Sequence, residues 1–99
     1  MRRVQRRLQI TGPLTESSAR SILRRQAEKL QLVGWVQKGQ GTGLELVVNG
    51  PERTVQTFIS WIRGGPLRAL VEDVQSTSEP REAFFEFSVR QPKPADTEA

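Results

Sequence analysis

The beginning of the chain alternates apolar and polar side chains, with Val4, Leu8 and Ile10 on one side of the alternation and Gly12 ending it. A period of two residues is typical of a half-buried strand, so this pattern predicts a β-strand over residues 3 to 11. Shorter apolar or alternating segments bounded by Gly and Pro predict further strands. These lie at residues 33 to 38, 44 to 48, 69 to 76 and 85 to 89, and the glycine-rich residues 39 to 43 join the first two of them as a hairpin.

Two other segments carry apolar side chains at helical spacing. The first follows a run of Thr and Ser side chains that can cap a helix, and it predicts a helix over about residues 18 to 31. In the second, Val55, Phe58 and Ile62 recur at the i, i+3 and i+7 positions of one helical face, between breaks formed by Gly and Pro. Both helices are therefore expected to bury one face against the rest of the protein.

The predicted elements follow the order strand, helix, strand, strand, helix, strand, with one additional edge strand. This order predicts an α+β protein, a ferredoxin-like sandwich of βαββαβ order in which an antiparallel sheet carries both helices on one face. A chain of 99 residues supports only one hydrophobic core, so we expect a single domain over residues 1 to 90. Residues 91 to 99, with Pro92 and Pro94, are expected to form a disordered C-terminal tail.

Residue composition narrows the chemistry. The sequence contains no Cys and no His, which removes thiolate nucleophiles, the commonest general base and the usual transition-metal ligands. We therefore expect no metal site and no cofactor. Any catalysis has to use Arg, Lys, carboxylates, hydroxyls or backbone amides.

The same composition bears on location. With 35% hydrophobic and 26% charged residues, the chain has the make-up of an ordinary soluble globular protein. No apolar run approaches the roughly 18 residues that span a bilayer. The basic residues 1 to 7 are not followed by the apolar region of a secretory signal. We therefore expect a cytoplasmic monomer without membrane contact.

Charge is distributed unevenly along the chain. Residues 1 to 38 carry nine basic and two acidic side chains, a net charge of +7, whereas residues 39 to 99 carry six basic and nine acidic ones. An excess of this kind favours an anionic partner, either a small phosphate-bearing anion or a nucleic acid. No aromatic-rich RNA-binding motif accompanies the arginines, so the nucleic-acid alternative depends on charge alone.

Several spaced motifs point to one family. Residues 65 to 74, GPLRALVEDV, fit the pattern G-P-x-x-A-x-V-x-x-V at every specified position. Residues 32 to 36, LVGWV, precede them, and residues 87 to 90, FSVR, are similar to an F-x-I-R ending. In this order, over about residues 4 to 90, the motifs resemble those of acylphosphatases. The resemblance implies a ferredoxin-like fold and the hydrolysis of acyl phosphates without a metal.

The resemblance also implies a phosphate-binding loop. In the family this loop has the pattern G-x-V-Q-G-V-x-F-R, and its amides and final Arg hold the phosphate. Ungapped alignment puts it on residues 12 to 20, where Gly12 and Arg20 are retained and Glu16 replaces the inner Gly. A carboxylate opposes an anion, and a Cβ restricts the backbone where the family has Gly. The residues implied to bind phosphate are Thr15, Glu16, Ser17, Ser18, Ala19 and Arg20.

The second member of the family's catalytic pair is an Asn that orients the attacking water, and here its position holds Lys38. A protonated Lys has three donors and no acceptor, so it cannot orient water as an amide does. The resemblance therefore implies Arg20 and Lys38 as the catalytic positions of a domain whose acyl-phosphate hydrolase activity is lost or strongly reduced, and which serves as an anion-binding or interaction module. Two alternatives stay open. One is an active, divergent acylphosphatase that hydrolyses carboxyl-phosphate anhydrides, and the other is a non-specific nucleic-acid-binding domain.

Overall fold

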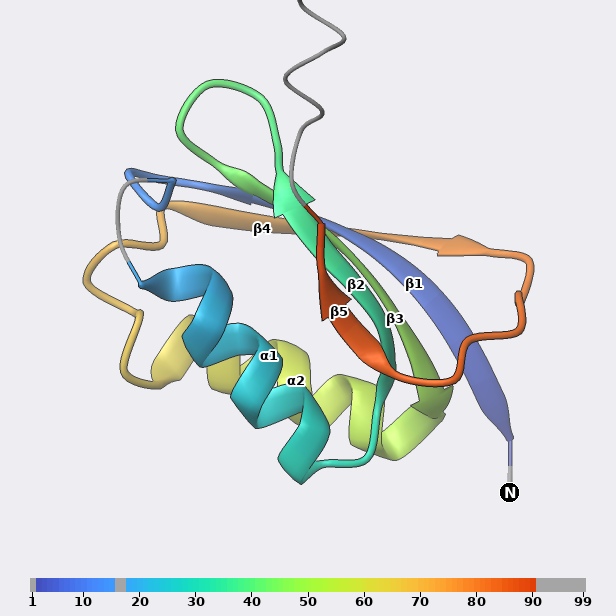
Figure 1. The fold of residues 1–99 in the computed structure, drawn as a ribbon. Coiled ribbons are helices and arrows are strands. Elements are labelled where there is room, and N and C mark those ends of the chain that lie inside the picture. Colours follow the sequence, from blue (N-terminus) through green and yellow to red (C-terminus); the bar gives the residue numbers. More distant parts are fainter. Residues whose placement is uncertain (1, 16–17, 91–99) are drawn as a thin grey trace, which may run out of the picture.

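The structure, a computed structural model, describes residues 2 to 15 and 18 to 90. Two helices lie side by side on one face of a five-stranded sheet (Figure 1). The predictions for Glu16, Ser17 and the tail at residues 91 to 99 lie outside the described residues. In chain order the elements are β1 (Arg3–Thr11), α1 (Ala19–Lys29), β2 (Val33–Lys38), β3 (Leu44–Pro51), α2 (Glu52–Gly64), β4 (Asp73–Glu79) and β5 (Phe87–Val89).

The strand order β4-β1-β3-β2-β5 confirms the predicted ferredoxin-like α+β sandwich. Four strands pair antiparallel as expected, but β5 pairs parallel with β2, so the prediction of an entirely antiparallel sheet is wrong for its last strand. The reason is geometric. Because β4 runs opposite to β2, a chain that turns back after β4 and reaches the other edge of the sheet arrives parallel to β2 (Figure 1).

The fourth strand begins later than its sequence pattern predicts. The pattern predicts a strand over residues 69 to 76, whereas β4 runs from Asp73 to Glu79. Residues 66 to 70 instead form successive turns, in which the amides of Leu70 and Val71 both donate to the carbonyl of Leu67. In these turns Leu67 is buried in the core and Leu70 and Val71 pack against it. A short apolar run does not distinguish that arrangement from a strand.

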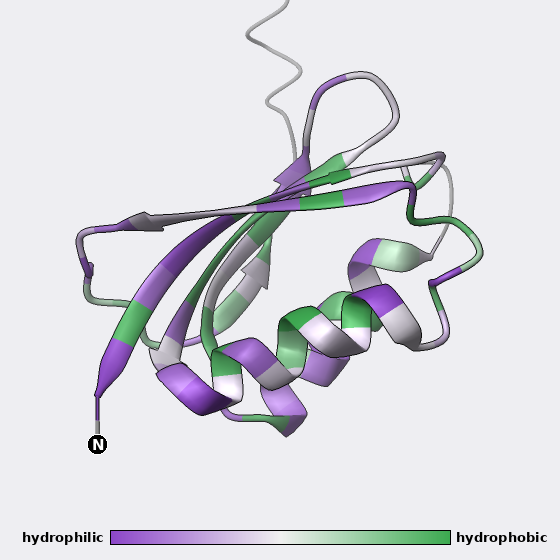
Figure 2. Cartoon of the chain, turned by 180° about the vertical axis from the view of Figure 1, so that it is seen from behind, coloured by the Kyte–Doolittle hydropathy of each residue, from purple (hydrophilic) through white to green (hydrophobic). Residues whose placement is uncertain are grey.

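The core lies between the helices and the facing side of the sheet. Helix α2 buries Val55, Phe58 and Ile62, the residues whose spacing predicts the helix, and α1 buries Leu23 among others. The Phe58 ring stacks on Trp61 with ring centroids 6.1 Å apart. Figure 2 shows hydrophobic residues concentrated where the helices meet the sheet and hydrophilic ones on their outer sides. Within the described ranges, neither helix is long and apolar enough to cross a membrane.

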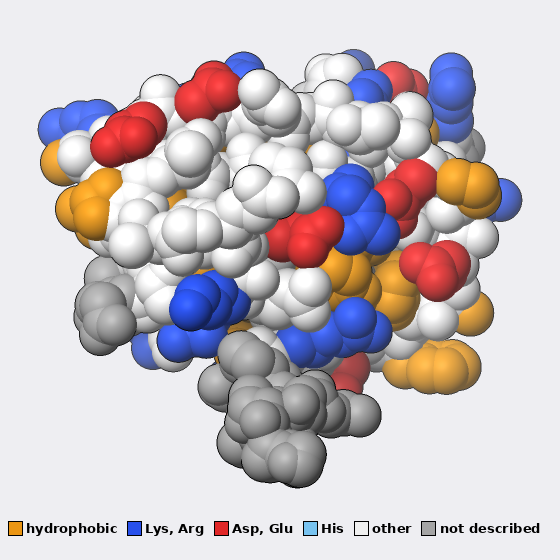
Figure 3. Space-filling view, turned by 90° about the horizontal axis from the view of Figure 1, so that it is seen from above, with side chains coloured by type: hydrophobic (Ala, Val, Ile, Leu, Met, Phe, Trp, Pro, Cys, Tyr) orange, Lys and Arg blue, Asp and Glu red, His pale blue; other side chains and the backbone are white. Residues whose placement is uncertain are grey.

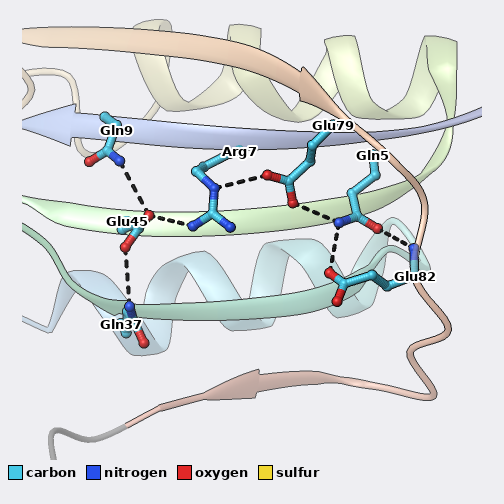
Figure 4. A network of polar contacts seen from close by, with 7 residues as sticks. All are labelled: Gln5, Arg7, Gln9, Gln37, Glu45, Glu79 and Glu82. Carbon is cyan, nitrogen blue, oxygen red and sulfur yellow. Dashed lines mark hydrogen bonds and ion pairs between the residues drawn. The ribbon is translucent and has the colours of Figure 1, made fainter.

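The face of the sheet that bears no helix is covered by polar side chains. Arg7 donates to Glu45 at 2.5 Å and to Glu79 at 2.9 Å (Figure 4). These hydrogen bonds raise the pKa of Arg7 above its ordinary value, and the bond to Glu45 contributes more than the bond to Glu79. Trp35 lies beneath the guanidinium groups of Arg7 and Arg90, which are 5.5 and 4.4 Å from its ring centre. Acidic and basic side chains consequently lie next to one another on this face (Figure 3).

One amide in this network is completely buried. The side-chain Nε2 of Gln5 donates to Glu79 and Glu82, and its Oε1 accepts from the Glu82 amide (Figure 4). The same Oε1 also accepts from the side chain of Asn49. We expect Gln5→Leu to lower the free energy of unfolding by about 2 kcal/mol, because the buried side-chain amide of Asn49 and the part-buried backbone amide of Glu82 both lose an acceptor. Urea denaturation measures this change. Gln9→Leu is the matched control, since Gln9 is exposed and makes one bond to Glu45 at 3.2 Å. Equal effects of the two substitutions would contradict the assignment.

Candidate functional site

The loop after β1 begins with a glycine that no other residue can replace without strain. Gly12 has φ of +141°, and a Cβ built on it would lie 2.0 Å from the carbonyl oxygen of Leu70. The loop is therefore seated directly against the segment that precedes β4. This close approach explains the Gly at the start of the loop by packing rather than by contact with a ligand.

The same loop is bonded to the hairpin between β2 and β3. The amides of Leu14 and Thr15 both donate to the carbonyl of Thr42, at 2.9 and 3.0 Å. The hydroxyl of Thr42 donates back to the carbonyl of Gly12 at 2.9 Å. These two amides are thus committed to the hairpin. The hydroxyl of Thr15 is buried and has no hydrogen-bond partner in the described part of the chain.

Arg20 is the second residue of α1 and is half-buried. Its Nη2 donates to the carbonyl of Thr15 at 3.5 Å, a long bond that leaves most of the guanidinium's five N–H groups for other acceptors. Over residues 2 to 15 and 18 to 90 no carboxylate pairs with Arg20. It also lies at the positive end of the α1 dipole. The arrangement therefore suits an anion.

The neighbours of Arg20 contribute unequally. Ser18 precedes α1, is exposed, and makes no side-chain capping bond, so its hydroxyl is free to meet a ligand. The side chain of Ala19 is fully buried in the core, which limits Ala19 to a backbone contribution. Of the predicted phosphate-binding side chains within the described residues, those of Ser18 and Arg20 are therefore open to solvent at least in part, whereas the hydroxyl of Thr15 is buried.

Lys38 ends β2 and is exposed. Side chains alternate along a strand, and Val36 lies in the core while Gln37 bonds to Glu45 on the uncovered face. Alternation therefore places Lys38 on the helix side of the sheet, where α1 lies. Lys38 pairs with Leu44, which also pairs with Ile10 near the end of β1. The structure thus brings Lys38 to the same end and face of the sheet as the loop that leads to Arg20.

Thr42 is the residue that sequence reasoning missed. The pattern of residues 39 to 43 predicts only a glycine-rich turn. In the structure, Thr42 connects the hairpin to the loop after β1 by hydrogen bonds of both its hydroxyl and its carbonyl. A hydroxyl residue between Gly41 and Gly43 is the only signal in the sequence that could have indicated such a contact.

The basic residues of the N-terminal third do not gather on one surface. Arg7 is paired with two carboxylates on the uncovered face, and Arg6, the next residue to it in β1, points to the opposite face. Arg24 pairs with Glu28 at 3.8 Å. This distribution gives no support to the polynucleotide-binding alternative, which needs a continuous basic face.

Comparison with known proteins agrees with the fold. The acylphosphatase family model matches residues 6–89. An acylphosphatase of Azoarcus sp. is 37% identical over 70 residues, 71% of each chain. That of Caldivirga maquilingensis is 37% identical over 89 residues, 88% of this chain and 94% of the relative. The solved structure of an acylphosphatase from Coxiella burnetii superposes with a TM-score of 0.81 at 28% identity, covering 89% of this chain and 93% of the other. The chain belongs to the acylphosphatase family.

Proposed function

We propose that the protein is an acylphosphatase, which hydrolyses a carboxyl-phosphate anhydride to a carboxylate and phosphate, and that it works more slowly than a relative with Asn at position 38. The observation that carries this proposal is the guanidinium of Arg20, which lies at the start of α1 without a carboxylate partner among the described residues. The curated relatives that bear the name acylphosphatase support the reaction class.

In this reaction the oxygen of a water molecule forms a bond to phosphorus. The bond from phosphorus to the acyl oxygen breaks, the carboxylate leaves with the electron pair, and the proton of the water passes to solvent. Phosphoryl transfer of this kind depends mainly on positioning and on stabilising charge at the phosphoryl oxygens. Arg20 supplies several N–H donors to those oxygens, with the hydroxyls of Thr15 and Ser18 nearby in sequence.

Lys38 stands where the family has an Asn that orients the attacking water. Its ammonium group can hold a phosphoryl oxygen as a point charge, but it has no acceptor for a hydrogen of the attacking water. Binding of the phosphoryl group is therefore retained better than orientation of the nucleophile. Compared with a relative that has Asn at position 38, we therefore expect this protein to have a lower kcat and a KM that is not higher.

We expect Lys38→Asn to raise kcat for acetyl phosphate by about 10- to 100-fold, because the new amide accepts a hydrogen bond from the attacking water. KM should rise as well, since one positive charge is lost. Steady-state hydrolysis of acetyl phosphate by the purified chain measures both constants. Lys29→Asn, an exposed Lys in the last turn of α1, is the matched control and should leave both unchanged. A kcat that falls in Lys38→Asn would overturn the role given to Lys38.

A second candidate is a domain that binds phosphate at Arg20 without hydrolysing anything. Lys38 and the commitment of the Leu14 and Thr15 amides to Thr42 favour it. The same assay separates the two functions. Wild-type hydrolysis no faster than that of Arg20→Ala, together with phosphate-induced NMR shifts at Ser18 and Arg20, would establish the second candidate in place of the first.

A further inference from the structure

A hollow of about 360 Å³ lies on the uncovered face, between the β4–β5 connection and the sheet. Arg3 and Asn49 line it, and β1 begins and β3 ends there, whereas the candidate catalytic loop follows the other end of β1. The hollow is therefore separate from the site of Arg20 and Lys38. Its volume falls at the lower end of the range that holds small organic ligands.

One wall of the hollow is fixed by buried amides. Glu82, in the β4–β5 connection, donates its amide to Gln5 Oε1 at 2.7 Å, and its carbonyl accepts from Asn49 Nδ2 at 3.2 Å. The side chains of Gln5 and Asn49 are 1% and 5% exposed. A connection held by such bonds does not have to be ordered when a ligand arrives, which lowers the entropic cost of binding.

The charges that line the hollow favour an anion. Arg81 is exposed and has no acceptor in the described part of the chain, and Arg3 makes a single bond to Asn49 at 3.3 Å. Glu82 is the acidic residue of the lining and opposes an anion, but its Oε1 already accepts from Gln5 Nε2 at 3.0 Å. Two guanidinium groups thus outweigh one carboxylate.

The rest of the lining is apolar. Val33, Ala83 and Phe84 contribute to it from β2 and from the β4–β5 connection. An inorganic anion would leave these surfaces in contact with water, whereas an apolar group attached to the anion would cover them.

We propose that this hollow binds a small organic carboxylate, with the carboxylate held by Arg81 and Arg3 and its apolar group against Val33, Ala83 and Phe84. A planar guanidinium matches the two oxygens of a carboxylate in a bidentate arrangement. The inference rests on the hollow alone and does not depend on the proposed hydrolase activity.

Benzoate is the probe for the test, titrated into the ¹⁵N-labelled full chain at constant pH and ionic strength. We expect saturable shifts at the amides of Val33, Asn49, Glu82 and Ala83, with a Kd of about 1 to 10 mM for a ligand of this size. Benzamide, which has the ring without the charge, should give no saturable shifts at these amides. Acetate, which has the charge without the ring, should bind at least about fivefold more weakly than benzoate.

One variant tests whether Arg81 holds the anion, and a matched control removes the same charge elsewhere. Arg81→Gln should weaken benzoate binding at least about fivefold, because a charge-assisted bond is lost while the exposed position keeps the fold intact. Arg25→Gln, which removes the same charge from the exposed side of α1, should leave the Kd unchanged. Unaltered binding by Arg81→Gln, equal binding of benzamide, or shifts confined to residues 18 to 20 would each overturn the proposal.

Discussion

Replacing Arg20 with Ala is expected to lower kcat/KM for acetyl phosphate by about 10³-fold or more, the effect typical of removing an arginine that stabilises a transferred phosphoryl group. In the transition state the phosphoryl oxygens carry spread negative charge, and Arg20 is the half-buried guanidinium at the start of α1 that faces no carboxylate among the described residues. Initial rates of acetyl phosphate hydrolysis, corrected for the uncatalysed reaction, measure the change.

Two further variants test whether the effect of Arg20→Ala comes from a specific contact of Arg20 with the phosphoryl group or from the loss of any positive charge on α1. Arg24→Ala removes an exposed arginine about one helical turn later, already paired with Glu28, and should change kcat/KM less than about twofold. Arg20→Lys keeps the charge but loses the planar fork, so its kcat/KM should lie between those of wild type and Arg20→Ala. Equal activity of Arg20→Ala and Arg24→Ala would remove Arg20 from the site.

The fold could be predicted where one periodic pattern had one structural explanation. The alternation along β1 and the helical spacing of Val55, Phe58 and Ile62 both matched the structure, because each buries one face against the same core. The start of β4 could not be predicted in this way. Leu67 is buried and Leu70 and Val71 are half-buried in a turn, and a short apolar run does not distinguish a turn from a strand.

The candidate site was only partly accessible from the sequence. The motif spacing led to Arg20 and Lys38, and the structure brings Lys38 to the end of the sheet where the Arg20 loop begins. The carbonyl of Thr42 accepts hydrogen bonds from the amides of Leu14 and Thr15. The sequence could not predict these bonds, because every residue has a backbone carbonyl and the pattern of side chains does not indicate which one is used. The burial of Gln5 likewise depends on a connection more than 70 residues later in the chain.

Gly34→Ala is expected to destabilise the protein by about 3 kcal/mol, the sum of backbone strain and overpacking between neighbouring strands. Gly34 lies in β2 between β3 and β5 and has φ of +137°. A Cβ there would lie 1.9 Å from the carbonyl oxygen of Val47, which is fixed within β3 and cannot move aside without breaking strand pairing. For a domain of this size the thermal midpoint should fall by about 12 to 24 °C, measured by circular dichroism.

Two other glycines separate the contributions to this effect. Gly41 has φ of +60° with nothing within 4 Å of an added Cβ, so Gly41→Ala should cost only the backbone strain, about 1 kcal/mol. Gly64 ends α2 with neither a positive φ nor a close neighbour, so Gly64→Ala should be neutral or slightly stabilising. A cost for Gly34→Ala no larger than that for Gly41→Ala would show that β2 can shift relative to β3. Because Lys38 belongs to β2 and Thr42 to the hairpin that follows, a sheet that shifts there would not hold Lys38 and the Arg20 loop in one fixed arrangement, and the catalytic roles given to both residues would lose their structural basis.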